Sequence, residues 1–341
     1  MKQKIIVTGG CGYIGSHTVV ELLTNNFEVV IVDDLSNSTI KILDRIEKIT
    51  AVKPEFVHID LKSAAATKDF FESHKDAAAV IHFAAHKAVA ESIQNPLMYY
   101  NNNFVSLINV LISMQEFGIS NFIFSSSATV YGNPSVMPIR EQTPTQRPFS
   151  PYGNSKRIAE EILEDVCSAH PDFSTILLRY FNPIGAHSSG FIGEFPSGVP
   201  NNLMPYITQT AAGLREKLSV FGDDYPTKDG TAVRDYIHVV DLADAHVKAV
   251  SRLLSDYTQS NIETINLGTG IGYSVLEVIK AFEAVSGKPL NYEVTSRREG
   301  DVAELYASTA LAKKLLNWEA KLGLESMVQS SWDWEQNLRN E

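Results

Sequence analysis

Short apolar runs alternate with longer segments of helical periodicity over the first half of this chain. Between two β-branched runs, for example, Val19, Leu22 and Leu23 recur at the spacing of one helix face. The alternation predicts strands near residues 4–8, 28–32, 56–59, 80–83, 122–124 and 175–178, and helices near 16–25, 65–74, 97–117 and 153–169. Strands that alternate with helices indicate an α/β fold with a parallel, doubly wound sheet.

The alternation of predicted strands and helices ends after about residue 182, where glycine and proline residues indicate a loop-rich region. A helical pattern follows at 204–216, and one more strand is predicted at 262–267. Five prolines between residues 133 and 151 predict an ordered, non-helical loop. We therefore expect a first domain over 1–182 and a smaller, irregular α/β domain over 183–341, with segments near 235–270 that can return to the first domain.

Charge and cysteine usage narrow the classes of function. The formal net charge of −11 argues against a nucleic-acid or anionic membrane surface, although a local cluster of cations can still bind an anionic small molecule. The two cysteines, Cys11 and Cys167, lack metal-ligand spacing, so no metal site is predicted. Neither a signal peptide nor a membrane span is predicted, and the cytoplasm is the expected location.

The sequence Thr8-Gly-Gly-Cys-Gly-Tyr-Ile-Gly15 joins the first strand to the first helix. Its glycines fit the fingerprint of a Rossmann-type dinucleotide site, in which a tight turn brings the helix N-terminus to the pyrophosphate. Asp33 ends the next strand, and a carboxylate there accepts a bond from the ribose 2′-hydroxyl and repels a 2′-phosphate. The sequence therefore predicts NAD rather than NADP as cofactor.

Tyr152 and Lys156 lie four residues apart in a predicted helix, which places both side chains on one face. A lysine cation beside a phenol favours the phenolate and lowers the tyrosine pKa from about 10 towards that of a general base. Alone, the same spacing also fits two residues on a solvated helix face. The pair is therefore a candidate catalytic pair whose interpretation depends on the surrounding motifs.

Several longer motifs occur together with this pair. They include FIFSSSATVYG at Phe122–Gly132, SPYGNSK at Ser150–Lys156, LRYFNPIGAH at Leu178–His187, VRDYIHVVDLADAH at Val233–His246 and RREGD at Arg297–Asp301. With the glycine turn, they resemble the extended short-chain dehydrogenase/reductase family, and most closely its UDP-glucose 4-epimerases. The resemblance covers essentially the whole chain. It implies an enzyme that uses tightly bound NAD to interconvert UDP-galactose and UDP-glucose through a 4-keto intermediate.

The resemblance also implies roles for individual residues. Tyr152 acts as general base and acid on the O4 proton, Ser127 hydrogen-bonds O4, and Lys156 holds the nicotinamide ribose. Besides Tyr152 and Lys156, the residues implied at the cofactor are Gly9, Gly12, Tyr13, Ile14, Gly15, Asp33, Asp34, Asn37, Ser38, Asp60, Leu61, Phe83, Ala84, Lys87, Asn102, Ser125 and Tyr180.

The UDP-sugar is expected to contact both halves of the chain. Besides Ser127 and Tyr152, the implied substrate residues are Lys87, Phe181, Asn182, Asn202, Leu203, Phe221, Arg234, Arg298, Asp301 and Leu305. The two arginines suit the diphosphate, because a guanidinium matches phosphate geometry. Leu305 stands where the family carries either a large tyrosine, which restricts the pocket to plain hexoses, or a small residue, which admits N-acetylated sugars. Weak activity on UDP-N-acetylhexosamines is therefore an open possibility.

Other functions on the same scaffold are weighed against this one. A 4,6-dehydratase needs an acidic pair after the catalytic hydroxyl, but Ala128-Thr129-Val130 follows Ser127. A UDP-uronate or UDP-N-acetylglucosamine 4-epimerase stays open as an alternative, and the former needs a further cation for the C6 carboxylate. A non-catalytic NAD-sensing protein is expected to have lost Tyr152 or Lys156. The resemblance also implies a homodimer formed through helices near 97–117 and 153–169.

Overall fold

The computed structural model describes residues 2–196, 198–255, 257–298 and 300–340. The chain divides into two compact units. Unit 1 comprises Met1–Gly132, Pro144–Arg179 and Ala243–Ile265, and unit 2 comprises Asn133–Thr143, Tyr180–Leu242 and Asn266–Glu341. The expected boundary near residue 182 falls close to the division between Arg179 and Tyr180. The expected domains differ from this division at Asn133–Thr143, which groups with unit 2 through long-range contacts such as the bond from Ile139 N to Tyr306 O (2.9 Å).

Unit 1 is built on a seven-stranded sheet of the order β10-β6-β5-β4-β1-β2-β3. The pairs of β1 with β2 and β4, of β2 with β3 and of β4 with β5 are parallel. The strands are β1 (Lys4–Thr8), β2 (Glu28–Asp33), β3 (Glu55–His58), β4 (Ala79–His82), β5 (Asn121–Ser127), β6 (Ser174–Tyr180) and β10 (Ile262–Leu267). The predicted doubly wound α/β fold is confirmed. The strand order reverses between β1 and β4, where such sheets bind their ligands.

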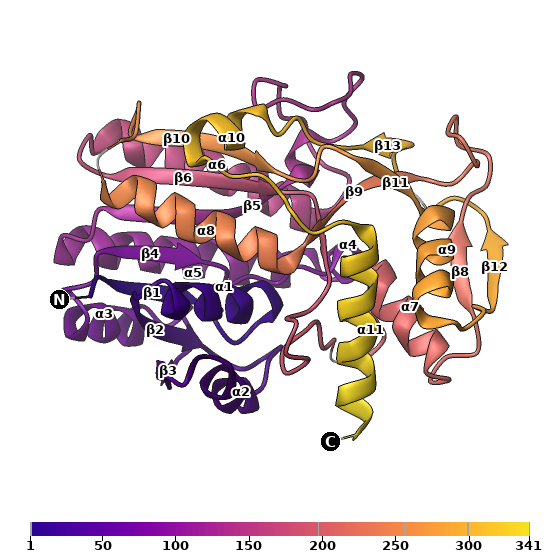
Figure 1. The fold of residues 1–341 in the computed structure, drawn as a ribbon. Helices are drawn as coiled ribbons and strands as arrows, with labels where there is room; N and C mark the ends of the chain where they lie inside the picture. The colour runs from indigo at the N-terminus through magenta and orange to yellow at the C-terminus, as the bar shows by residue number, and fades with distance from the viewer. Residues whose placement is uncertain (1, 197, 256, 299, 341) are drawn as a thin grey trace. The chain divides into compact units, whose positions relative to one another are not determined.

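Helices cover both faces of this sheet (Figure 1), which explains why its strands read as continuous apolar runs. Helices α1 (Tyr13–Thr24) and α8 (Val239–Leu254) lie in front of the sheet in that view. Behind it, α5 (Pro96–Phe117) packs between α3 (Ala64–Ser73) and α6 (Pro151–Ala169). Leu107 and Phe122 are fully buried in the resulting core. The remaining helices are α2 (Lys41–Thr50), α4 (Val89–Gln94) and the short 3₁₀ helix η1 (Ala128–Tyr131).

Unit 2 contains two small sheets with helices packed against them. Strand β9 (Val233–His238) pairs with β7 (Asn182–Ile184), β11 (Gly272–Ser274) and β13 (Glu304–Leu305), and β8 (Leu218–Phe221) pairs with β12 (Tyr292–Thr295). The helices are α7 (Leu203–Ala211), α9 (Val275–Ser286), α10 (Ala310–Leu316) and α11 (Leu324–Asn340). The helix predicted over 204–216 is too long, because it ends at Ala211 and Gly213 has a φ of +79°.

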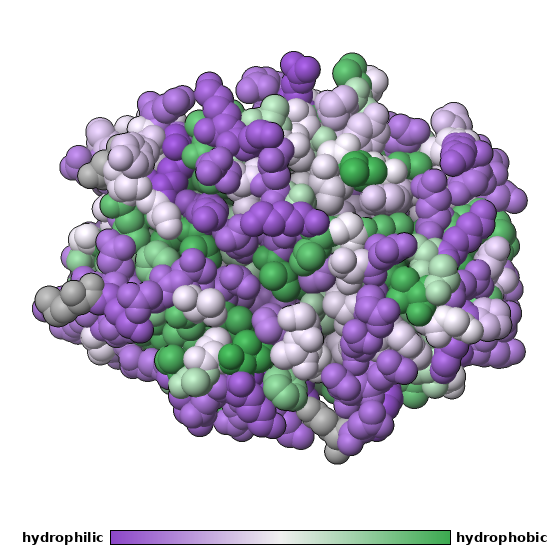
Figure 2. All heavy atoms as spheres, in the orientation of Figure 1, coloured by the Kyte–Doolittle hydropathy of each residue, from purple (hydrophilic) through white to green (hydrophobic). Residues whose placement is uncertain are grey.

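Hydrophilic side chains predominate on the face drawn in Figure 2, and apolar groups form only small patches there. Among the described residues, no helix combines the length and the apolar composition that crossing a membrane requires. The non-helical loop predicted over 133–151 is confirmed as far as Ser150, because α6 begins at Pro151.

Candidate active site

The glycine turn between β1 and α1 leaves no room for side chains. Gly9 has a φ of +69°, and a Cβ there would lie 2.7 Å from the Ala84 backbone nitrogen. A Cβ on Gly15 would lie 2.3 Å from the Gly9 carbonyl oxygen. Helix α1 begins at Tyr13 behind Gly12, which provides no side-chain cap. A helix that begins without a side-chain cap suits an anionic group such as a pyrophosphate at its N-terminus.

Asp33, at the end of β2, is buried beside this turn. Its Oδ2 accepts a bond from Cys11 N (3.0 Å), and its Oδ1 accepts bonds from Leu35 N and Ser38 Oγ (both 2.9 Å). Burial raises the pKa of the carboxyl, and these three bonds oppose that increase. Because a carboxylate offers about four acceptor positions, one on Oδ2 remains for a ribose hydroxyl. Ser38, predicted at the cofactor, thus holds Asp33 in place.

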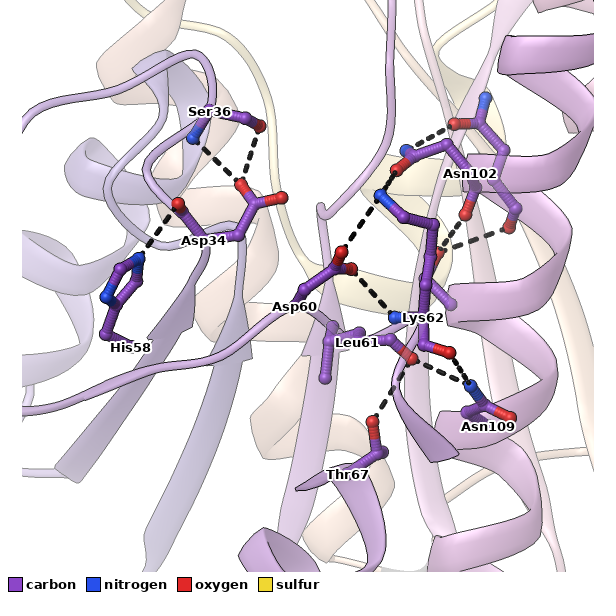
Figure 3. Close-up of polar contacts among 11 residues, drawn as sticks. Asp34, Ser36, His58, Asp60, Leu61, Lys62, Thr67, Asn102 and Asn109 are labelled. Atoms are coloured by element: carbon purple, nitrogen blue, oxygen red, sulfur yellow. Dashed lines mark hydrogen bonds and ion pairs between the residues drawn. The ribbon is translucent and has the colours of Figure 1, made fainter. Parts of the chain in front are cut away.

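A second polar group lies near the ends of β2 and β3 (Figure 3). Burial alone would raise the pKa of Asp34. Bonds from Ser36 N (2.9 Å) and Ser36 Oγ (2.6 Å), together with nearby positive charge, outweigh burial and lower the pKa. Lys62 Nζ lies 3.0 Å from Asn102 Oδ1 and 3.2 Å from Asp60 Oδ2. Asp60 and Asn102, both predicted at the cofactor, therefore both bind the ammonium group of Lys62. We did not predict Lys62 as a site residue. Its position directly after Asp60-Leu61 is the only sequence signal for it.

The other predicted cofactor residues lie at or after the ends of several strands of the unit 1 sheet, or in the first turn of α1. Phe83 N donates to Thr8 O (3.0 Å), and the Lys87 Nζ lies 5.6 Å from the centroid of the Tyr13 ring. Leu61 is buried, and its carbonyl oxygen accepts a bond from Asn109 Nδ2 (2.9 Å). Ile14 lies half-buried in the first turn of α1, Ala84 follows Phe83, Asn37 lies in the loop after β2, and Tyr180 ends β6.

Helix α6 presents the candidate catalytic residues of unit 1. Pro151 occupies its first turn, and the Ser150 side chain caps it by accepting a bond from Gly153 N (3.1 Å). A Cβ on Gly153 would lie 2.8 Å from Pro148 Cβ, so this glycine lets the helix approach the preceding loop. Tyr152 and Lys156 therefore share one face at the start of α6, as their spacing predicts.

Ser127 ends β5 and contacts Tyr152. Its Oγ accepts bonds from Thr129 N (3.2 Å) and Thr129 Oγ1 (3.0 Å), which cap η1. Burial raises the pKa of the Tyr152 phenol, and the hydrogen bond with Ser127 opposes that increase only in part. The expectation that Lys156 brings this pKa down from about 10 is therefore wrong for the ligand-free site, because burial raises the pKa by more than the contact with Ser127 lowers it.

Lys156 is itself a buried cation. Its Nζ donates to Ser125 O (2.6 Å) and lies 4.7 Å from the centroid of the Phe124 ring. Burial lowers the pKa of its ammonium group to about 7, against the opposing effect of Glu160. Glu160, which we did not predict, forms a buried ion pair with Arg179 (2.7 Å) and accepts a hydrogen bond from Ser126. Its place four residues after Lys156 on α6 is the sequence signal that could have found it.

Unit 2 brings Arg234, Arg298 and Asp301 together. Arg298 Nη2 lies 2.9 Å and Arg234 Nη2 lies 3.5 Å from Asp301 Oδ1. Arg234 Nη1 also donates to the carbonyl oxygens of Val233 and Val302 (both 2.8 Å). Phe221, at the end of β8, lies with its ring centroid 5.8 Å from the Arg298 guanidinium carbon. Two guanidiniums thus pair with one carboxylate, and an exposed aromatic ring lies beside one of them, an arrangement that suits an anionic nucleotide.

The neighbouring Asp235, within β9, connects this strand to the turn after β10 and to the segment after β13. It accepts bonds from Thr269 N (2.7 Å), Gly270 N (3.0 Å) and Ala307 N (3.1 Å). Leu305 pairs with Arg234 across β13 and β9, and is only 8 % exposed.

The last predicted substrate residues of unit 2 lie on β7, beside it or at α7. Asn182 pairs with Tyr236 in the β7–β9 register, and the buried Phe181 donates from its backbone N to Leu267 O (3.1 Å). Asn202 precedes α7 and donates from Nδ2 to Glu194 Oε1 (2.6 Å), while Leu203 packs on the core of unit 2.

Known proteins resemble this chain over nearly its full length. A sequence profile described as GDP-mannose 4,6 dehydratase matches residues 6–331. A UDP-glucose 4-epimerase from Bacillus subtilis is 52 % identical, over 99 % of this chain and 98 % of its own. Two crystal structures of UDP-glucose 4-epimerases are each 45 % identical over 99 % of both chains. One, from Stenotrophomonas maltophila, has a TM-score of 0.96 and holds NAD and formylated UDP-arabinopyranose; the other, from Bifidobacterium longum, has a TM-score of 0.95 and holds NAD⁺ and UDP.

Proposed function

The chain belongs to the UDP-glucose 4-epimerase family, and we propose on that premise that it interconverts UDP-galactose and UDP-glucose with NAD as its cofactor. The observation that carries this proposal is that Tyr152 lies beside Ser127 and shares the start of α6 with the buried Lys156, in the unit that also holds the glycine turn. The dehydratase named by the matching profile needs an acidic pair after its catalytic hydroxyl. This chain has Ala128-Thr129-Val130 there instead.

The residues of unit 1 fit NAD. The packed glycines and the uncapped start of α1 suit the pyrophosphate, and the remaining acceptor position of Asp33 suits the adenosine ribose. When bound, NAD supplies an acceptor and then a donor for the hydride at C4 of the hexose, together with a positive charge on its nicotinamide ring. Asp34, Asp60, Lys62 and Asn102 form the polar group that we assign to the adenosine end.

Tyr152 is proposed to take the O4 proton of the sugar and to return it at the end of the reaction. Burial raises the pKa of its phenol in the ligand-free protein and so favours the neutral form. Any positive charge added nearby opposes that effect, since an opposite charge stabilises the phenolate. Ser127 then hydrogen-bonds both the phenol and O4, and the phenolate in turn favours the protonated form of Lys156. Loss of the proton and of the C4 hydride gives a 4-keto sugar, and addition to the opposite face inverts C4.

Unit 2 is proposed to hold the UDP part of the substrate. Arg234 and Arg298 pair with the diphosphate, Asp301 accepts bonds from the ribose, and Phe221 lies beside the uracil. The support is the Arg234–Asp301–Arg298 group, which gathers cations in a chain whose formal net charge is −11. The residues on β7 and α7, from Asn182 to Leu203, complete this proposed site.

A second activity, on UDP-N-acetylhexosamines, depends on Leu305. The side chain is buried next to Arg234 in the β13–β9 pair, and its volume lies between those of alanine and tyrosine. If leucine closes the pocket, the wild type will not turn over UDP-N-acetylglucosamine and Leu305→Ala will. Efficient turnover by the wild type would show instead that leucine already admits the N-acetyl group.

We also propose a homodimer. Leu97 (81 % exposed), Ile108 (41 %) and Ile112 (56 %) recur on one face of α5, and Ile93 of α4 is 58 % exposed. Apolar side chains on one helix face are typical of a surface that another protein covers. A second copy of this chain is the expected partner.

The direct test of the epimerase proposal uses the purified protein and UDP-galactose without added NAD. Formation of UDP-glucose, followed by chromatography or NMR, is the expected result, and Tyr152→Phe should abolish it. Tyr100→Phe is the matched control, because it removes a phenol hydroxyl bonded to Asn154 and should retain activity. If wild-type protein fails to convert the substrate even with NAD added, the proposal is wrong.

A further inference from the structure

The hydroxyl oxygen of Tyr225, in the loop after β8, is buried and has no hydrogen-bond partner among the described residues. The residue is only 5 % exposed. Its backbone is paired, because Tyr225 N donates to Gly230 O (2.9 Å) and Thr227 N donates to Tyr225 O (2.7 Å). A buried hydroxyl without a partner costs free energy, so the fold gains nothing from this oxygen.

Close packing fixes the ring of Tyr225. The guanidinium carbon of Arg297 lies 4.1 Å from its centroid. A Cβ on Gly222 would lie only 2.6 Å from Tyr225 Cε2, so the ring occupies the space that a side chain at 222 would need. The orientation of the hydroxyl is therefore set by contacts that do not involve the hydroxyl itself.

The charges around Tyr225 are those of the group assigned above to UDP. Burial and the Asp301 carboxylate raise the pKa of its phenol, whereas Arg297, Arg234 and Arg298 lower it. Arg297 also pairs with Asp224 (2.6 Å), so three guanidiniums and two carboxylates lie near the ring. A neutral O–H donor among cations is suited to an anionic oxygen, because it donates a hydrogen bond and adds no further charge.

We infer that Tyr225 is a substrate-binding residue whose hydroxyl donates a hydrogen bond to a diphosphate oxygen of the bound UDP-sugar. The inference rests on the proposed function, which assigns the neighbouring Arg234 and Arg298 to that diphosphate. It accounts for a buried polar atom that the ligand-free fold leaves unsatisfied. It also predicts opposite effects on binding and on stability when the hydroxyl is removed.

The test is Tyr225→Phe, measured by calorimetry with UDP and with uridine. The variant should bind UDP about tenfold more weakly, as expected for one lost bond to a charged group, and should bind uridine as the wild type does. The melting temperature without nucleotide should stay the same or rise, because the removed oxygen has no partner in the fold. In turnover, KM for UDP-galactose should rise while kcat changes little. Tyr292→Phe, at a 40 % exposed position on β12, is the control and should change none of these values.

Each other outcome overturns the inference. Unchanged UDP affinity would show that the hydroxyl does not contact the nucleotide. An equal loss of affinity for uridine would show that the hydroxyl does not bind the diphosphate. A melting temperature several degrees lower without nucleotide would show a structural role instead. If the wild type binds no UDP, the proposed function fails and this inference fails with it. If the wild type binds UDP and the variant binds it equally well, only the inference is wrong.

Discussion

At the residue scale, Tyr152 and Lys156 show how burial changes the pKa values that their spacing alone suggests. The position of Lys156 four residues after Tyr152 is visible in the sequence, and the structure keeps both on one face of α6. The sequence does not show that Lys156 is only 4 % exposed or that its ammonium group donates to Ser125 O. Nor does it show that burial raises the pKa of Tyr152, because burial depends on residues distant in the chain.

Lys156→Met should stabilise the ligand-free protein and abolish most of its activity. Burial lowers the lysine pKa from 10.5 to about 7, so the unfolded chain binds more protons than the native protein between these values. This lysine therefore destabilises the fold most at low pH, and its penalty shrinks as pH rises from 7 to 10.5. The stability gained by the variant should be about 2.7 kcal/mol larger at pH 6 than at pH 9. Denaturant titrations at both pH values test this, and an equal gain at both would contradict it.

At the scale of elements, the β1–turn–α1–β2 unit is predictable because its determinants are local. The apolar run of β1, the glycines and Asp33 follow one another within thirty residues or so. The assignment of Asn133–Thr143 to unit 2 is not predictable in this way. It depends on Ile139, which pairs with Ala307, and on the bond from Asn266 Nδ2 to Ile139 O (3.1 Å), both far apart in sequence.

Gly9→Ala tests the glycine turn as an element. The substitution combines a φ of +69° with a Cβ 2.7 Å from Ala84 N, so it should destabilise the fold by several kcal/mol and remove bound NAD. Gly118→Ala is the matched control, because its φ is +74° and a Cβ there meets nothing within 4 Å. The control should cost about 1 kcal/mol and keep NAD. Thermal melts and the absorbance of released cofactor measure both effects; equal losses in the two variants would show that the close approach is unimportant.

At the scale of the whole molecule, the exposed apolar face of α5 predicts association. Ile112→Glu should convert a dimer into a monomer in sedimentation velocity, because a charge buried without a partner disfavours the interface. Ile271→Glu replaces an apolar side chain of similar exposure (53 %) in unit 2 and should leave the dimer intact. If the wild-type protein sediments as a monomer, the homodimer proposal is wrong.

The central claim is that C4 loses a hydride and regains the same hydride on its opposite face. UDP-galactose carrying deuterium at C4 tests this directly when it is incubated with the enzyme in ordinary water and the product is examined by NMR. The predicted result is UDP-glucose that keeps the deuterium at C4, since a hydride held by a bound cofactor does not exchange with solvent. Product with hydrogen at C4 would show that the inversion proceeds by proton exchange, which would contradict the proposed roles of Tyr152 and NAD.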